Sequence, residues 1–359
     1  MALTIVLKVD PRKIDIEAID LAASYIRRGR LVAFPTETVY GLGCNALSSD
    51  AARRVYEAKG RPPDNPLIVH ISDFDMLYLV AREVPEKALK LAKRLWPGPL
   101  TLVLPKSDRV PPEVTAGLET VAVRMPAHPV AMALIERAGT PIAAPSANPS
   151  GRPSPTKAEH VLRDLSFKAD IVIDGGETIY GLESTILNLL GSVPVLLRPG
   201  AYPVEVLEEL LGEKIHVPEF AKGFGDAPRA LAPGMKHRHY APSTPLVLFE
   251  CSEYDGPHSP CLEKLVNAIL AFLKDVSGRP CIVASEETAK AYRDVGARVL
   301  VIGSRANLYE VAKRLFEVLR KLDEIGCDVA LMEGYPDRGL GLAIMNRARK
   351  ASVRRVVVS

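Results

Sequence analysis

Two cations, Lys59 and Arg61, stand one residue apart at the predicted end of a helix, in the segment KGRPPDN. Arginine presents a planar fork of donors and lysine a point charge, and both suit phosphate oxygens. A helix C-terminus also favours cations through its dipole alone. That explanation covers either cation, but it does not cover Asn65 or His70, which follow on the chain. The segment is therefore a candidate phosphate site, although a lone histidine on a strand is more often structural.

A second polar segment, PTETVYGLG at 35–43, directly follows the apolar run 31–34. Its threonines and Glu37 come where a strand ends, which is where α/β proteins place ligands. An ordinary turn explains the segment equally well. Gly41, Gly43 and Ala46 also match a GxGxxA dinucleotide fingerprint, but six residues separate the strand from the first glycine. The fingerprint also requires an acidic residue about 20 positions further on. That position falls near Arg61, which is basic, so the segment does not favour NAD binding.

Further candidates follow other predicted strands. Ser146, Asn148 and Ser154 lie in a loop rich in serine and proline, where such side chains can bind phosphate or ribose. From composition alone, a surface loop explains them better. Arg124 and Arg198 end two strands, which suits an anion site, but each alone could be a surface charge.

Composition sets the broad class of the protein. The 359 residues are 47% hydrophobic and 25% charged, which is typical of a folded globular chain and excludes a disordered one. The net charge of +3 does not by itself indicate a nucleic-acid binder. No apolar run approaches the ~18 residues of a membrane span, and the N-terminus does not resemble a secretory signal. The five cysteines form no CxxC pair, so we expect a cytoplasmic, reduced chain without a disulfide framework.

Hydrophobic periodicity predicts two α/β domains, 1–212 and 246–359, joined by a linker or lid at 213–245. In the first we expect a twisted open α/β sheet, and in the second a small Rossmann-like parallel sheet. The predicted helices are 15–28, 50–59, 85–95, 128–138, 262–276, 286–295, 308–322 and 340–351. The predicted strands are 31–34, 67–70, 100–104, 121–124, 141–144, 171–173, 184–189, one ending at 198, and then 246–249, 280–284, 299–302, 329–332 and 353–358.

The linker ends in HRHYAP at 237–242. His237 and His239 could bind a metal, but two histidines without acidic neighbours are weak evidence for a site. The basic residues near the C-terminus fit a solvated helix face better than a nucleic-acid patch. Gly339 and Gly341 match the first two glycines of a dinucleotide-binding motif, so an NAD-dependent oxidoreductase is a further alternative. The third glycine of that motif does not follow.

Taken in order, these segments resemble one family closely. PTETVYGLG, KGRP with a following NPL, PSAN, STI at 184–186 and LRPG at 197–200 look like the motifs of YrdC-type threonylcarbamoyl-AMP synthases. The linker and the second α/β domain match the long, two-domain form. The resemblance implies a nucleotidyltransferase that converts L-threonine, bicarbonate and ATP to L-threonylcarbamoyladenylate and pyrophosphate. This is the first step of threonylcarbamoyladenosine modification next to the tRNA anticodon.

The resemblance also implies roles for individual residues. Lys59 and Arg61, with Ser146 and Asn148, correspond to the family's catalytic set. The residues implied to hold threonine are Thr38, His70, Arg124, Ala144 and Ser184. Those implied to hold ATP are Lys59, Arg61, Asn65, Thr120, Ser146, Asn148, Ser154, Arg198 and Tyr240, of which Thr120 and Ser154 lie outside the signature motifs.

The expected cofactor is Mg2+ brought with ATP, and no protein carboxylate set for the metal is evident. The expected partners are the three substrates, the threonylcarbamoyl transferase complex and tRNA, with no membrane. The alternative function is an RNA-binding module of the same fold without turnover. Since Lys59 and Arg61 end a helix, we expect Lys59→Ala and Arg61→Ala to fold with little loss of stability.

Overall fold

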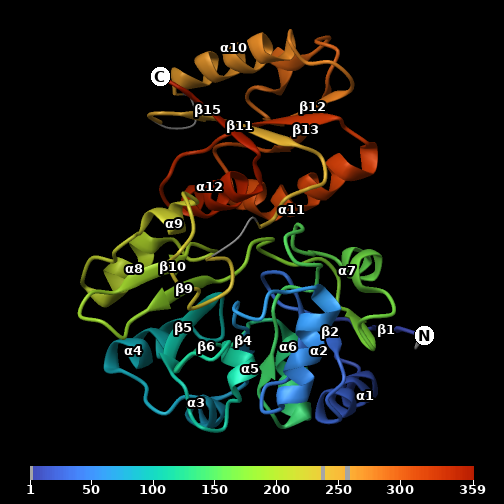
Figure 1. Ribbon diagram of the computed structural model, residues 1–359, viewed down its shortest axis with the longest axis vertical. Helices are drawn as coiled ribbons and strands as arrows, with labels where there is room; N and C mark the ends of the chain where they lie inside the picture. The colour runs from blue at the N-terminus through green and yellow to red at the C-terminus, as the bar shows by residue number, and fades with distance from the viewer. Residues whose placement is uncertain (1–2, 236–238, 255–258) are drawn as a thin grey trace. The chain divides into compact units, whose positions relative to one another are not determined.

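The computed structural model describes residues 3–235, 239–254 and 259–359. The chain divides into two compact units (Figure 1). The first unit comprises Met1–Ser150, Ser154–Ala221 and Gly225–His237. The second comprises Gly151–Pro153, Lys222–Phe224 and Arg238–Ser359. Each unit has its own sheet.

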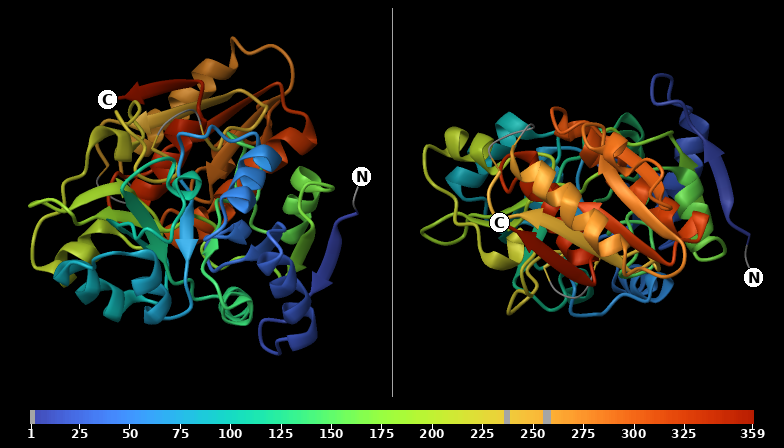
Figure 2. Two further views of the ribbon diagram at one scale, coloured as in Figure 1. Left: turned by 60° about the horizontal axis from the view of Figure 1, so that its bottom comes forward. Right: turned by 90° about the horizontal axis from the view of Figure 1, so that it is seen from above.

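The first unit is built on a mixed ten-stranded sheet with the order β1-β8-β2-β3-β7-β4-β6-β5-β9-β10. The N-terminal strand β1 forms one edge (Figure 2). Pairs such as β4 with β6 are parallel, whereas β2 with β3 and β9 with β10 are antiparallel. The strands are β1 (Ile5–Lys8), β2 (Val32–Pro35), β3 (Tyr40–Asn45), β4 (Ile68–His70), β5 (Leu100–Pro105), β6 (Thr120–Arg124), β7 (Ile142–Ala143), β8 (Ile171–Asp174), β9 (Thr185–Asn188) and β10 (Val195–Arg198).

Helices cover this sheet because each carries an apolar stripe. In α1 the stripe Ile19, Ala22, Ala23 and Ile26 is buried against the sheet and α6. The Asp15 side chain caps α1 by accepting the Ala18 N–H at 3.1 Å. The helices are α1 (Ile16–Arg27), α2 (Ser49–Lys59), α3 (Phe74–Val80), α4 (Glu86–Leu95), α5 (Pro112–Thr115), α6 (Pro129–Ala138), α7 (Ala158–Leu165), α8 (Val204–Leu211) and α9 (Glu219–Lys222), whose last residue belongs to the second unit.

The second unit has a five-stranded sheet in which every pairing is parallel, with the order β13-β12-β14-β11-β15. Helix α10 covers one face, and α11 and α12 cover the other (Figure 1). Its core gathers Phe249, Ile269, Ile282 and Leu331. The elements are β11 (Leu246–Cys251), α10 (Cys261–Leu273), β12 (Pro280–Ser285), η1 (Ala289–Tyr292), β13 (Arg298–Gly303), α11 (Leu308–Ile325), β14 (Val329–Glu333), α12 (Leu340–Ala351) and β15 (Arg354–Val358).

The predicted fold class is confirmed, an open α/β sheet followed by a small parallel α/β sheet, while several elements differ. Residues 40–45 form strand β3 rather than part of a glycine loop. A Cβ on Gly43 would lie 2.7 Å from the Phe34 ring, so glycine here allows strands to pack closely. The predicted helix 286–295 shortens to the 3-10 turn η1. Helices α3, α7 and α8 were not predicted, because each is only seven or eight residues long.

The segment at 213–245 also has more structure than a linker pattern predicts. It contains the short helix α9, and Ala227, Ala232 and Met235 are buried in a core cluster of the first unit with Ile68. Small apolar residues without helical spacing can still pack onto a sheet face, and periodicity does not detect them.

The prediction of a reduced chain without disulfides is wrong for the second unit. Cys251, at the end of β11, is bonded to Cys261 at the start of α10. Cys281 in β12 is bonded to Cys327, which precedes β14. Cysteine spacing could not reveal this, because the second bond joins residues 46 apart in sequence that meet only through the pairing of β12 with β14. Cys44 is a buried free thiol, and burial raises its pKa to about 12.

Candidate active site

The ends of β4 and β6 place two predicted site residues side by side. These strands are parallel, and their register pairs His70 with Arg124. Both side chains are buried, with 4% and 3% exposed. Arg124 Nε donates to the carbonyl of Gly98 at 3.4 Å. The carboxyl ends of adjacent parallel strands thus bring a cation and an imidazole to one point of the sheet.

The turn between β2 and β3 reaches the same point. Arg124 Nη1 donates to Thr38 Oγ1 at 2.9 Å, and Arg124 Nη2 lies 2.7 Å from Glu37 Oε2. Thr36 Oγ1 and Thr38 Oγ1 are hydrogen-bonded at 2.8 Å, and Thr36 Oγ1 donates to the carbonyl of Val39 at 2.7 Å. The turn is therefore ordered by its own hydroxyls and presents Glu37 and Thr38 to the guanidinium.

His70 is a neutral ring at physiological pH. Burial, with the nearby Arg124 charge as a second cause, lowers the pKa of His70 to about 3. The ring packs edge-on against Phe34 with centroids 6.1 Å apart. Its Nδ1 has no hydrogen-bond partner among the described residues. A buried imidazole nitrogen in this state can exchange a hydrogen bond with a small polar ligand.

Ser184 and Arg198 lie at the start of β9 and the end of β10, and β5 stands between β9 and the strand β6 that carries Arg124. Ser184 Oγ and Thr101 Oγ1 are hydrogen-bonded at 2.7 Å. Arg198 Nη2 donates to the Ser184 carbonyl at 3.1 Å, and Arg198 Nη1 donates to that of Pro233 at 3.4 Å. Arg198 is thereby fixed from two directions, which is the arrangement needed for a preorganised cation.

The phosphate candidate is built at the end of α2. The helix ends because Gly60 adopts a left-handed conformation at φ 60°, and its N–H caps the carbonyls of Glu57 and Tyr56. This turn directs Lys59 Nζ to the carbonyls of Ser146 and Asn148. Arg61 Nη2 donates to Asn65 Oδ1 at 2.6 Å, and Arg61 Nε to the Asn65 carbonyl at 3.0 Å. The structure thus joins the KGR and PSAN segments, 87 residues apart for Lys59 and Ser146.

Burial changes what we expect of these two cations. Lys59 is 4% exposed and Arg61 8% exposed. The prediction that their loss costs little stability assumed an open helix end. Because each donates to oxygen atoms inside the protein, alanine at either position removes buried charge-assisted hydrogen bonds, which costs about 1–3 kcal/mol.

The remaining predicted residues lie in different places. Ala144 donates its N–H to the Ile68 carbonyl at 2.8 Å, beside His70. Ser154 Oγ donates to Glu183 Oε1 at 2.6 Å. Thr120 begins β6, and its Oγ1 has no hydrogen-bond partner among the described residues. Tyr240 belongs to the second unit, where its ring lies 5.3 Å from that of Phe316.

Two histidines of the HRHYAP motif remain. His237 lies outside the described residues. His239 contacts the Tyr240 ring with centroids 5.6 Å apart. Across the described ranges, no group of three or more histidine, cysteine, aspartate or glutamate side chains is placed to hold a metal ion.

Three site neighbours were not assigned a role from the sequence: Glu37, Thr101 and Glu183. Glu37 and Glu183 directly precede the predicted residues Thr38 and Ser184. Their position next to a predicted site residue is the feature of the sequence that could have identified them. Thr101 gave no signal, because only the parallel pairing of β5 with β9 brings it to Ser184.

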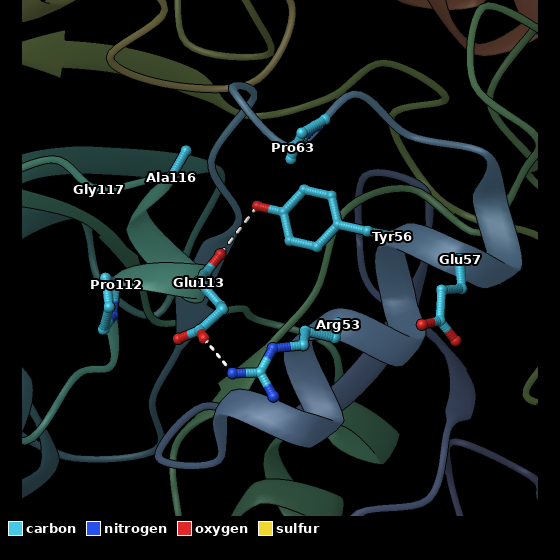
Figure 3. Close-up of a pocket in the computed structure, with 8 residues that line it drawn as sticks. All are labelled: Arg53, Tyr56, Glu57, Pro63, Pro112, Glu113, Ala116 and Gly117. Atoms are coloured by element: carbon cyan, nitrogen blue, oxygen red, sulfur yellow. Dashed lines mark hydrogen bonds and ion pairs between the residues drawn. The ribbon is translucent and has the colours of Figure 1, made fainter.

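A cavity of about 480 Å³ lies beside the candidate phosphate site of Lys59 and Arg61, between α2 and α5 (Figure 3). The Tyr56 ring and Pro63 form part of its wall. Tyr56 donates its hydroxyl to the carbonyls of Asn65 at 3.1 Å and Glu113 at 3.0 Å. Arg53 and Glu113 form an ion pair at 2.5 Å. None of the predicted site residues is among those that line it, so this cavity is not the predicted substrate site.

The architecture defines a class: a YrdC-type α/β domain followed by a parallel α/β domain. Residues 24–200 match the Sua5/YciO/YrdC family model, described as telomere recombination. Residues 202–353 match the model described as the C-terminal domain of threonylcarbamoyl-AMP synthase. A crystal structure of Pyrococcus abyssi Sua5 complexed with L-threonine superposes with a TM-score of 0.89 at 48% identity, covering 99% of this chain and 100% of that one.

Two curated relatives are named threonylcarbamoyl-AMP synthase. The protein from Pyrococcus abyssi is 48% identical over 99% of both chains. The protein from Bacillus subtilis is 49% identical over 94% of this chain and 93% of its own. The chain therefore belongs to the threonylcarbamoyl-AMP synthase family and is an enzyme of the nucleotidyltransferase type. The resemblance predicted from the ordered motifs is confirmed, over the alternative of an RNA-binding module without turnover.

Proposed function

We propose that this chain uses the described site to make L-threonylcarbamoyladenylate and pyrophosphate from L-threonine, bicarbonate and ATP. The observation that carries the proposal is the pair of buried cationic clusters within the first unit, one around Arg124 at the end of β6 and one around Lys59 and Arg61 at the end of α2. An amino-acid carboxylate and a triphosphate are the two anions that the reaction must hold.

We assign the Arg124 cluster to L-threonine. The guanidinium supplies the anchor for the carboxylate, and Thr38 and His70 flank it with a hydroxyl and an unpartnered imidazole nitrogen. The Ala144 backbone and Ser184 complete the proposed set. A site that hydrogen-bonds the substrate hydroxyl rejects analogues lacking it. The crystal structure of the Pyrococcus abyssi relative with L-threonine supports this substrate.

We assign the second cluster to the nucleotide. In the structure Lys59 Nζ is bonded to loop carbonyls, and we propose that it turns to the triphosphate when ATP binds. Arg61, Asn65 and Arg198 are already held in place. The full proposed set is Lys59, Arg61, Asn65, Thr120, Ser146, Asn148, Ser154, Arg198 and Tyr240, the last assigned by its motif position.

The proposed chemistry needs alignment more than covalent help from the protein. The threonine nitrogen takes up a carboxyl group from bicarbonate with loss of water, and a carbamate oxygen then displaces pyrophosphate from the α-phosphorus. That displacement is in line, so the enzyme must position the two reactants and stabilise charge on the phosphoryl oxygens. Lys59, Arg61 and Arg198 supply that charge.

We propose that Mg2+ enters as part of the substrate MgATP. The described residues offer no cluster of metal ligands. Of the carboxylates at the site, Glu37 is paired with Arg124 and Glu183 accepts from Ser154. This donor set fits an ion held by phosphates and water, which is usual for magnesium bound with a nucleotide.

We place the protein in the cytoplasm, with the transferase complex and tRNA as the consumers of its product. Of the helices that the structure describes, none has the length and apolar character needed to cross a lipid bilayer. The two disulfides are unusual for this location, because cytoplasmic thiols are kept reduced except in hyperthermophilic organisms.

The test is pyrophosphate release from ATP and bicarbonate by the purified chain, with and without L-threonine. We expect release only when threonine is present, and much less with L-serine. Release without an amino acid, or none from folded protein with all three substrates, would contradict the proposal.

A further inference from the structure

The Glu37 carboxylate is buried without the donors that a carboxylate needs. It is 2% exposed, and neither oxygen accepts a hydrogen bond from any described residue. Oε2 lies 2.7 Å from Arg124 Nη2, but outside hydrogen-bond geometry. An ionised carboxylate has about four acceptor positions, and leaving them empty in the protein interior is costly. Such a group is unusual unless a ligand supplies the missing donors.

The groups around Glu37 do not satisfy it. On the same turn, the Thr36 and Thr38 hydroxyls are bonded to each other, and Thr36 also donates to Val39. His128, at the start of α6, is near enough for Glu37 to act on its charge, but burial lowers the pKa of His128 overall. Its Nδ1 accepts the Val130 N–H at 3.2 Å. Burial thus disfavours the charged form of His128, and Arg124 is the one ion-pair partner of Glu37 among the described residues.

The pair Arg124–Glu37 is complementary to an amino acid in its zwitterionic form. A guanidinium binds a carboxylate through parallel N–H donors, and an ammonium group offers three donors to a carboxylate. Arg124 and Glu37 stand as a cation and an anion at contact distance, as do the two charged groups of an α-amino acid. Binding would replace one buried ion pair by two and would supply the donors that Glu37 lacks.

We infer that Glu37 is the receptor for the α-ammonium group of L-threonine, with Arg124 holding the α-carboxylate. This inference rests on the proposed function and adds the residue that recognises the substrate nitrogen. It also assigns a specificity: ligands that keep the carboxylate and the β-hydroxyl but lack the ammonium group bind poorly, because they leave Glu37 unpaired.

The test compares L-threonine with 3-hydroxybutanoate, which differs by the absence of the amino group. Affinities are measured by titration calorimetry on the full chain. In the wild type we expect threonine to bind at least about 100-fold more tightly. In Glu37→Gln we expect this ratio to fall at least about 10-fold, chiefly through weaker threonine binding, as loss of a charge-assisted hydrogen bond predicts.

The matched control is Glu57→Gln, which removes a carboxylate from the exposed face of α2 and should leave the ratio unchanged. Glu37→Asp keeps the charge and should retain most of the ratio. Equal weakening of both ligands in Glu37→Gln would overturn the inference, because it would show that Glu37 only positions Arg124. A wild-type ratio below about threefold would overturn it without any variant. Failure of wild-type threonine binding or pyrophosphate release would instead contradict the proposed function.

Discussion

Both units of the molecule bury an arginine–glutamate pair at the ends of strands, yet the two pairs differ in how fully they are satisfied. In the second unit, Arg305 Nη2 donates to Glu333 Oε2 at 2.8 Å. The same oxygen accepts from Ser285 N and Ser285 Oγ, and Oε1 accepts from the Tyr292 hydroxyl. In the first unit, Glu37 accepts no hydrogen bond from a described residue.

The difference separates a structural ion pair from a ligand site. Arg305 also donates to the Gly334 carbonyl at 2.9 Å and lies 4.6 Å from the Tyr335 ring centre. A saturated network of this kind holds its own geometry and has no unused capacity for a ligand. Arg124 and Glu37 retain capacity, and they lie beside an unpartnered imidazole nitrogen. Burial alone does not mark a functional site, whereas burial with unmet hydrogen-bonding capacity does.

The largest expected effect is on catalysis in the first unit. Lys59→Ala should lower threonine-dependent pyrophosphate release by 100-fold or more, because it removes a cation from the proposed triphosphate site. The unfolding free energy should fall by only about 1–3 kcal/mol, from the loss of the two hydrogen bonds that Lys59 donates to the carbonyls of Ser146 and Asn148. Circular dichroism and pyrophosphate assays measure the two effects. Retained turnover would remove Lys59 from the catalytic set.

The next largest effect is expected for the fully hydrogen-bonded pair of Arg305 and Glu333 in the second unit. Arg305→Ala should destabilise the second unit by about 3–5 kcal/mol, because it leaves the Glu333 charge buried without its cation. Threonine binding by calorimetry should be unchanged if the pair is purely structural. A variant of normal stability with altered threonine affinity would break the distinction drawn between the two pairs.

The disulfides also distinguish the two units, because both pairs of bonded cysteines lie in the second unit. By loop-closure entropy, the Cys281–Cys327 bond should stabilise the fold by about 4 kcal/mol and the Cys251–Cys261 bond by about 3 kcal/mol. Thermal melts of Cys281→Ala and Cys251→Ala, compared with wild type in the absence of reductant, check the order. A larger loss from Cys251→Ala would show that chain entropy does not set the ranking.

The smallest effect concerns His70. Its folded-state pKa of about 3 lies below the unfolded value of 6.5, so the unfolded chain binds a proton that the folded chain excludes. The stabilisation is therefore fully present above about pH 6.5 and is lost progressively as the pH falls toward 3. Between pH 7 and pH 5 this residue should cost the fold about 2 kcal/mol. Denaturant unfolding of wild type and His70→Gln at both pH values measures this change in unfolding free energy. An equal change between pH 7 and pH 5 in the two proteins would refute the prediction.

Much of the fold followed from local pattern. Apolar spacing and Asp15 located α1, and Gly60 located the end of α2 that carries Lys59. Short elements such as α7 escaped prediction, because their apolar faces become recognisable only against the sheet that they cover. The site residues in motifs were found from the sequence, whereas Glu37 was visible there only as one polar residue among several.

The amino-acid sequence by itself determined which chemical groups the protein has, where its longer helices and most of its strands lie, and which family it belongs to. These properties depend on neighbours a few residues away, or on ordered motifs that can be read along the chain. Only the tertiary structure decided that Glu37 meets Arg124, that Lys59 is buried, and that Cys281 is bonded to Cys327. Those outcomes depend on strand order and register, which bring together residues 46 to 87 positions apart and which local propensity does not encode.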